Sequence, residues 1–124
     1  MQSLTPYLFI LGTVAGTSLG QFLVKAGVDA VKKTAPETSL QFIISSLLNP
    51  LIILGLAMAF GAFLSWIFAM RHFPLNYAYP FTALNITIVF LLSSVIFNEQ
   101  IPPIYWLGFF LIVSGVGVLF FARV

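Results

Sequence analysis

Charge is scarce in this chain of 124 residues, which carries only five basic and three acidic side chains. The formal net charge of +2 is too small to favour nucleic acid as a partner. The chain has no cysteine, which excludes disulfides and thiol chemistry. One histidine and three scattered carboxylates are too few for a dedicated metal site. We therefore expect neither a metal nor another cofactor.

Apolar residues take the place of charge and make up 60% of the sequence, against roughly 45–50% in soluble proteins. They fall in four stretches of about 20 residues, the length of helix that crosses the ~30 Å core of a bilayer. The fold class indicated is an all-α integral membrane protein, a bundle of four transmembrane helices forming one domain over 1–124. Such a chain has no room for a soluble catalytic domain, so we expect it not to be an enzyme.

The predicted spans are separated by short polar segments. They cover about 6–28, 50–70, 75–97 and 104–121. Turns this short place successive helices antiparallel and adjacent. The first stretch lacks the basic start of a signal peptide, so we expect a retained span. Asn49 before Pro50 has the pattern of an N-cap followed by proline at the first helical position, which predicts the start of the second span.

A shorter apolar pattern lies between the first two spans. Its members recur at the spacing of one helical face: Leu40, Ile43, Ile44, Leu47 and Leu48. This predicts a short amphipathic helix in the membrane interface, and the alternative is an extension of the second span. Thr34 and Glu37 have the spacing of a capping box, and Pro36 suits a first helical turn, so the helix is expected to begin there.

Orientation in the membrane is weakly specified by charge. One side of the membrane carries Arg71 and Arg123, and the other carries Lys32 and Lys33, with Lys25 added if its side chain reaches the headgroups. This is nearly a tie under the positive-inside rule, so a cytoplasmic first loop and dual insertion both stay open.

The first span combines a glycine ridge with a polar stripe. Gly12, Gly16 and Gly20 form two overlapping G-x-x-x-G units, which let another helix approach closely. Beside them runs an inclined polar row at i+4 spacing: Thr13, Thr17, Gln21 and Lys25. Gln21 and Lys25 are interpreted in two ways. They line a polar cavity that holds an anionic group such as phosphate, or they serve as an interhelical amide and a snorkelling anchor.

The third span is interrupted by Pro80, which removes a backbone donor in a segment expected to cross the membrane. Such a break is tolerated where it meets a cavity or polar neighbours. Tyr79, Thr82 and Asn85 follow one another at three-residue steps, roughly along one face. They predict a substrate-lining face, and the alternative is an interfacial tyrosine with one interhelical asparagine hydrogen bond.

Two further candidates for substrate contact lie near the ends of spans. Trp66 is a candidate for substrate contact or an interfacial anchor. Glu99 is a loop carboxylate, a partner of Lys25, or a receiver for an amino group on a substrate. In the last span, Gly108 and Gly115 mark a small-residue face expected to pack against a second subunit.

Three segments carry a resemblance to known transporters. They are Gly20-Gln21 with Lys25, the run Pro74-Leu75…Ala78-Tyr79-Pro80…Leu84-Asn85, and Leu107-Gly108…Leu111-Ile112…Gly115-Val116. Together they resemble the small four-span, EamA-like branch of the drug/metabolite transporter superfamily. The first two segments are most similar to ArnE/ArnF-type subunits, which are proposed to flip undecaprenyl-phosphate-linked aminoarabinose. The third is similar to the dimer-forming helix of small multidrug-resistance exporters.

The resemblance implies a flippase for a polyprenyl-phosphate-linked sugar, or a related amphipathic anion, in the bacterial inner membrane. Membrane lipid and a homo- or heterodimer partner are implied as well. Lys25 is then expected at the phosphate, with Gln21, Tyr79 and Asn85 at the headgroup. Small multidrug-resistance exporters carry a glutamate in the first span where this chain shows only Gln21, which argues against proton-coupled drug exchange. A proton-coupled small-cation exporter and an accessory subunit of a membrane glycosyltransferase remain the alternatives.

Overall fold

A computed structural model describes residues 3–122 and contains helices and turns, with no strand among those residues. The elements are α1 (Thr5–Lys32), α2 (Ser39–Leu48), α3 (Pro50–Met70), α4 (Leu75–Ala78), the 3₁₀ turn η1 (Tyr79–Thr82), α5 (Ala83–Ile96) and α6 (Pro103–Ala122). Four helical segments are long and apolar enough to cross a membrane: α1, α3, α6 and the joined segment Leu75–Ile96. The predicted all-α, four-span membrane fold with a shorter apolar helix after the first span is confirmed.

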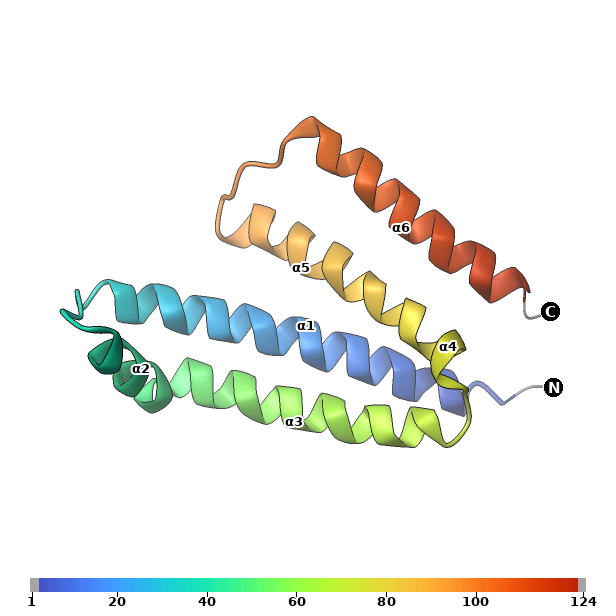
Figure 1. The fold of residues 1–124 in the computed structure, drawn as a ribbon, viewed down its shortest axis with the longest axis horizontal. Helices are drawn as coiled ribbons and strands as arrows, with labels where there is room; N and C mark the ends of the chain where they lie inside the picture. Colours follow the sequence, from blue (N-terminus) through green and yellow to red (C-terminus); the bar gives the residue numbers. More distant parts are fainter. Residues whose placement is uncertain (1–2, 123–124) are drawn as a thin grey trace.

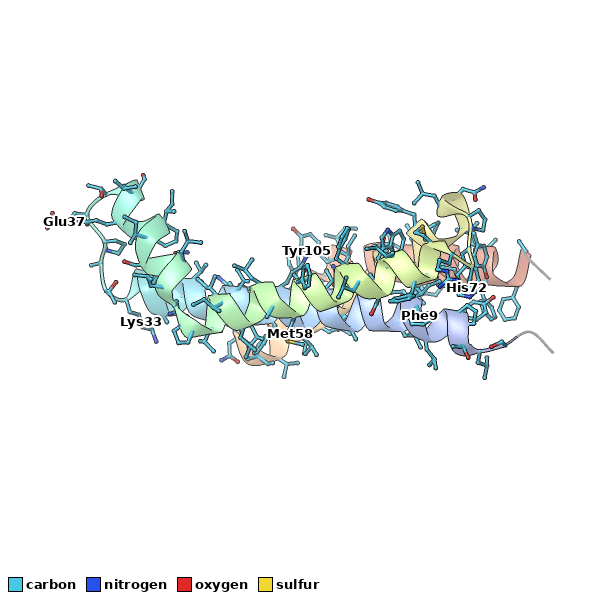
Figure 2. All side chains as sticks on the ribbon, turned by 90° about the horizontal axis from the view of Figure 1, so that it is seen from below. Phe9, Lys33, Glu37, Met58, His72 and Tyr105 are labelled. Carbon is cyan, nitrogen blue, oxygen red and sulfur yellow. The ribbon has the colours of Figure 1, made fainter. Side chains whose placement is uncertain are left out.

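The spans run side by side along one axis, with α1 between α3 and α5 in the view of Figure 1. The start of α1 and the end of α6 lie at one end of this bundle, together with the α3–α4 turn. The α2 helix lies at the other end. Figure 2 shows Lys33 and Glu37 at that end and Phe9 and His72 at the opposite one. The Arg123 used in the charge comparison above lies outside the described residues.

Helices α1 and α3 pack with their backbones almost in contact. A Cβ added to Gly20 would lie 2.9 Å from the carbonyl oxygen of Gly55, and one added to Gly55 would lie 2.7 Å from the carbonyl oxygen of Gly20. One turn earlier on α1, an added Cβ at Gly16 would lie 3.0 Å from the Ala62 side chain. The glycine ridge of the first span therefore receives the second span of the same chain.

An apolar and aromatic core closes the end of the bundle that holds the chain ends. Its buried members come from α1, α3, α4, η1, α6 and the α3–α4 turn: Ile10, Ala69, Phe73, Ala78, Phe81 and Val116. The ring centroids of Tyr7 and Phe73 are 4.9 Å apart, and those of Tyr77 and Phe81 are 5.3 Å apart. These ring pairs tie the ends of several helices together at this end of the bundle.

The α2 helix is separate from α3, which removes the alternative of a simple extension. Asn49 between them is extended, and its side-chain oxygen accepts hydrogen bonds from the backbone of Leu51 and Ile52, as the predicted N-cap should. The predicted start of α2 was wrong by four residues. Thr38, not Thr34, is the N-cap and accepts from the backbone N–H of Gln41, whereas the Thr34 hydroxyl donates to the Val31 carbonyl.

One helix limit differs from the sequence-based boundaries. The first helix continues to Lys32, past the predicted end near Val28, because the polar residues that end the apolar stretch do not end the helix. The third span is interrupted at Pro80 as predicted, since Pro80 cannot donate a backbone hydrogen bond and η1 replaces regular helix there. This irregular turn lies beside α1, and the polar residues of both elements meet there.

Candidate substrate-binding groove

A cavity of about 260 Å³ lies between α1 and the far end of α5. Its lining comes from α1, from α5 and from the start of the α5–α6 loop: Gln21, Phe22, Lys25, Val89, Leu92, Ser93, Phe97 and Glu99. It lies toward the end of the bundle opposite the aromatic core, so we call it the mouth cavity. The polar stripe of the first span thus supplies two of its lining residues, Gln21 and Lys25.

The Lys25 ammonium is shared between two carboxylates at the mouth cavity. Its Nζ lies 3.1 Å from Asp29 Oδ1, one helical turn further along α1, and 3.9 Å from Glu99 Oε1 on the α5–α6 loop. All three side chains are partly exposed, at 41%, 37% and 51% respectively. One cation between two anions leaves a local charge of −1. The cluster therefore presents both an ammonium for an anion and a spare carboxylate for a cation.

Aromatic rings form the wall beside this cluster. The rings of Phe22 and Phe97 lie 5.4 Å apart across the cavity, and the Lys25 ammonium lies 5.8 Å from the centre of the Phe97 ring. That distance is within the range of a cation–π contact. The loop segment 97–99 is therefore held to α1 by a ring pair, a cation–π contact and the longer of the two ion pairs.

A second cavity, of about 410 Å³, lies next to η1, and we call it the inner cavity. It is lined by α1, η1 and the start of α5: Thr13, Val14, Thr17, Tyr79, Pro80, Thr82, Ala83, Asn85 and Ile86. None of these residues is charged. The hydroxyl of Thr13 is already used, because it donates to the Phe9 carbonyl at 2.9 Å or to the Ala62 carbonyl at 3.3 Å.

The mouth and inner cavities meet at a short chain of polar side chains between α1 and α5. The Ser18 hydroxyl lies 2.6 Å from Asn85 Oδ1 and 2.8 Å from the Val14 carbonyl oxygen, and donates its one proton to either acceptor. Asn85 Nδ2 in turn donates to Gln21 Oε1 over 3.4 Å. The Gln21 Nε2 makes no hydrogen bond to the described residues. An unused donor therefore lies one turn from the Lys25 ammonium.

A third hollow, of about 430 Å³, lies on the other flank of α1, against α3. It shares Thr17, Gln21 and Lys25 with the two cavities already described, and Gly55 and Leu56 form part of its α3 wall. The polar stripe of α1 is consequently the floor of a groove whose walls are α3 and α5.

The predicted site residues divide among these places. Gln21, Lys25 and Glu99 line the mouth cavity, and Tyr79 and Asn85 line the inner cavity. Trp66 lines neither, and its ring lies 6.0 Å from that of Tyr79 in an edge-on arrangement.

The glycines singled out in the sequence differ in their surroundings. The three glycines of the first span, Gly12, Gly16 and Gly20, face α3. A Cβ added to Gly12 would lie 3.2 Å from the Ser65 hydroxyl oxygen. Gly108 and Gly115 on α6 have nothing within 4 Å of an added Cβ among the described residues. The α6 glycines therefore contact no other helix of the described chain.

Sequence reasoning missed two residues of this groove. Ser18 is only 1% exposed, and nothing in its neighbourhood distinguished it from the small residues that surround it. Asp29 falls just after the predicted first span of 6–28, whereas it belongs to α1 and pairs with Lys25. The i,i+4 spacing of Lys25 and Asp29 was the available signal, since such residues are neighbours on a helix surface.

No cluster of metal-binding side chains occurs within residues 3–122. The polar groups of the groove are an ammonium, carboxylates, amides and hydroxyls, which bind ligands by charge and hydrogen bonds.

Comparison with known proteins gives several relatives that share one description. The chain is 40% identical over 68 residues to proteins described as probable 4-amino-4-deoxy-L-arabinose-phosphoundecaprenol flippase subunit ArnE, from Salmonella paratyphi B, Salmonella typhimurium and Salmonella choleraesuis. The chain is similar to ArnE flippase subunits. The match covers 53% of this chain and 61% of each relative. No family model matches, and no solved structure does. The predicted resemblance to these subunits is confirmed, and the four apolar helices agree with a multi-pass membrane protein.

Proposed function

We propose that this chain is a subunit of a flippase for a polyprenyl-phosphate-linked sugar, of the aminoarabinose type named for its relatives, in the bacterial inner membrane. The observation that carries the proposal is the position of Lys25. Its ammonium lines a cavity between two spans, one turn from the unused amide donor of Gln21. Two donors beside each other at the membrane edge fit the oxygens of a phosphate.

The carboxylates beside Lys25 add a second contact. A phosphate that binds Lys25 releases Asp29 or Glu99 from its ion pair, and the freed carboxylate can accept an ammonium on the sugar. The apolar walls of the groove and the lipid beyond it suit the polyprenyl tail, which stays in the bilayer while the headgroup moves along α1. The exposed glycine face of α6 supports a dimer, since these four helices alone enclose only small cavities.

The test is binding and transfer by the purified protein, wild type beside Lys25→Ala. Native mass spectrometry should show undecaprenyl phosphate bound to the wild type. Loss of a charged hydrogen-bond donor costs about 1.5–3 kcal/mol, which corresponds to about tenfold to hundredfold weaker binding in the variant. The rate of headgroup transfer in liposomes should fall with it.

Lys33→Ala is the matched control, because it removes the same charge from an exposed residue that lines none of the three hollows along α1. It should bind and transfer as the wild type does. Equal binding and transfer by all three proteins would overturn the assignment of the phosphate to Lys25. Transfer that needs a second protein, with undecaprenyl phosphate still bound by this chain alone, would mean that the flippase is a heterodimer. No binding of undecaprenyl phosphate by this chain would point instead to the accessory-subunit alternative.

A further inference from the structure

The Ser18–Asn85–Gln21 chain separates two cavities of different chemistry. On the mouth side, the lining residues include Lys25 and Glu99, and Asp29 is paired with Lys25 there. On the inner side, the lining carries hydroxyl and amide groups but no charge. A ligand with a charged end and an uncharged polar end would find a matching environment on each side of this chain.

The inner cavity has hydrogen-bonding capacity that the described part of the protein does not use. The hydroxyls of Thr17 and Tyr79 make no hydrogen bond to the residues described, although both residues line this cavity. The Thr82 hydroxyl donates to the Tyr79 carbonyl at 2.5 Å and keeps its lone pairs for a donor. Polar groups in a membrane segment are costly to leave without partners, so a ligand with hydroxyls is stabilised there. A free ammonium or carboxylate would find no counter-charge.

The two side chains of the Asn85–Gln21 hydrogen bond are held in place very differently. Asn85 is anchored by the buried Ser18 at 2.6 Å, whereas Gln21 is exposed and lies 3.4 Å from Asn85, beyond the usual 2.7–3.2 Å of a hydrogen bond. Breaking this long contact leaves Asn85 in place and frees the Gln21 side chain to move. The path between the two cavities therefore opens at Gln21 and not at Asn85.

We propose that the inner cavity is a second subsite, which binds the uncharged, hydroxyl-bearing part of a sugar, and that Ser18 is a positioning residue that holds Asn85 at its entrance. This rests on the proposed function, since the phosphate of the same ligand stays at Lys25. The inner cavity, at about 410 Å³, falls within the ~300–1,000 Å³ range of small-molecule sites. Gln21 moves aside when the sugar passes between the cavities.

The experiment compares two ligands on each protein: undecaprenyl phosphate, and glucosyl phosphoundecaprenol, which adds an uncharged sugar and turns the phosphate monoester into a diester. The measured quantity is the preference for the glucosyl lipid, taken as the ratio of the two dissociation constants from titration with native mass spectrometry. The change in phosphate charge is the same for every protein, so the difference in this preference between a variant and the wild type reports on the sugar contact. Thr17→Val replaces a cavity hydroxyl by a methyl group and should reduce this preference about twofold to tenfold, the effect of one hydrogen bond. Binding of undecaprenyl phosphate should stay unchanged.

Thr87→Val is the matched control on α5. The Thr87 hydroxyl is buried, makes no hydrogen bond to residues 3–122 and lines neither cavity, so its loss should leave both constants as they are. Ser18→Ala should lower the preference in the same way as Thr17→Val. If Ser18 had only a structural role, Ser18→Ala would instead weaken the binding of both ligands equally. That result would overturn its assignment as a positioning residue.

The outcomes separate this inference from the proposed function. Thr17→Val and Ser18→Ala could both keep the wild-type preference while Lys25→Ala weakens the binding of both ligands. The assignment of the inner subsite would then be wrong, and the phosphate site would stand. If Lys25→Ala weakens neither ligand, the proposed function fails, and with it the inference that rests on it. A loss of preference in Thr17→Val but not in Thr87→Val supports the subsite.

Discussion

The α1–α3 pair and the α5–α6 pair are both made of apolar antiparallel helices, yet they are packed in opposite ways. In the first pair, backbone lies against backbone at Gly20 and Gly55. In the second, α5 has no buried residue among its members and α6 has one, Val116. Figure 1 shows α5 leaving the side of α1 as it runs away from the chain ends. Similar hydropathy therefore gives a closely packed pair and a loosely packed one.

This difference indicates which half of the groove is rigid. The floor residues Gln21 and Lys25 stand on the closely packed pair, whereas Asn85 and Glu99 stand on the loosely packed one. Since α5 has no buried residue and α6 has only Val116, these helices are the elements expected to move when a headgroup passes, and the contacts of segment 97–99 with α1 must break in that movement. The aromatic core at the other end holds all four spans together during such a movement.

The largest effect is expected where the close pair is forced apart. Gly55→Ala places a methyl group 2.7 Å from the Gly20 carbonyl oxygen and 2.8 Å from Val24 Cγ2, so one of the helices must shift. Overpacking of this kind costs about 1–3 kcal/mol, more than the helix gains from alanine. The midpoint of thermal unfolding in detergent should fall.

Gly61→Ala is the control for that change, because Gly61 lies on the same helix and an added Cβ there has no described residue within 4 Å. It should raise the unfolding midpoint slightly, since alanine favours helix over glycine by up to ~1 kcal/mol. Equal midpoints for the two variants would show that the close approach of α1 and α3 does not stabilise the fold.

The fold was largely predictable from the sequence because each span is marked by an apolar stretch of bilayer length. Asn49 and Pro50 predicted the first residue of α3 correctly, because an N-cap and a proline at the first helical position depend only on neighbouring residues. The start of α2 was missed because two threonines, Thr34 and Thr38, each have an acidic or amide residue three positions later. Only the path of the chain after Lys32 decides between them.

The groove was less predictable, because it depends on which helices are neighbours. Gln21 and Lys25 were found by their polarity in an apolar stretch. The choice of α3 as the partner of the glycine ridge could not be read from α1 alone, since G-x-x-x-G spacing suits any close helix. Ser18 became visible only when Asn85, 67 positions later, was placed beside it.

A smaller effect on the unfolding midpoint is expected at Gly115, on the glycine face of α6, because the α5–α6 pair is loosely packed. Gly115→Leu fills a position that is open in the described chain, so the unfolding midpoint of the monomer should change little. If the proposed dimer uses this face, the added side chain should lower the dimer fraction in liposomes, as measured by single-molecule photobleaching. An unchanged dimer fraction would move the subunit contact away from Gly115.

The smallest effect is expected where the two pairs meet, at Glu99. Glu99→Gln removes the more distant of the two carboxylates beside Lys25 and leaves Asp29 at 3.1 Å. Exposed ion pairs are worth about 0.2–1 kcal/mol, so the Lys25 ammonium should bind undecaprenyl phosphate more tightly by less than about fivefold. High salt should abolish the gain, since it screens exposed charges. Weaker binding in Glu99→Gln would instead mean that Glu99 holds Lys25 in the position the phosphate needs, and the α5–α6 loop would then be part of the site rather than a competitor for it.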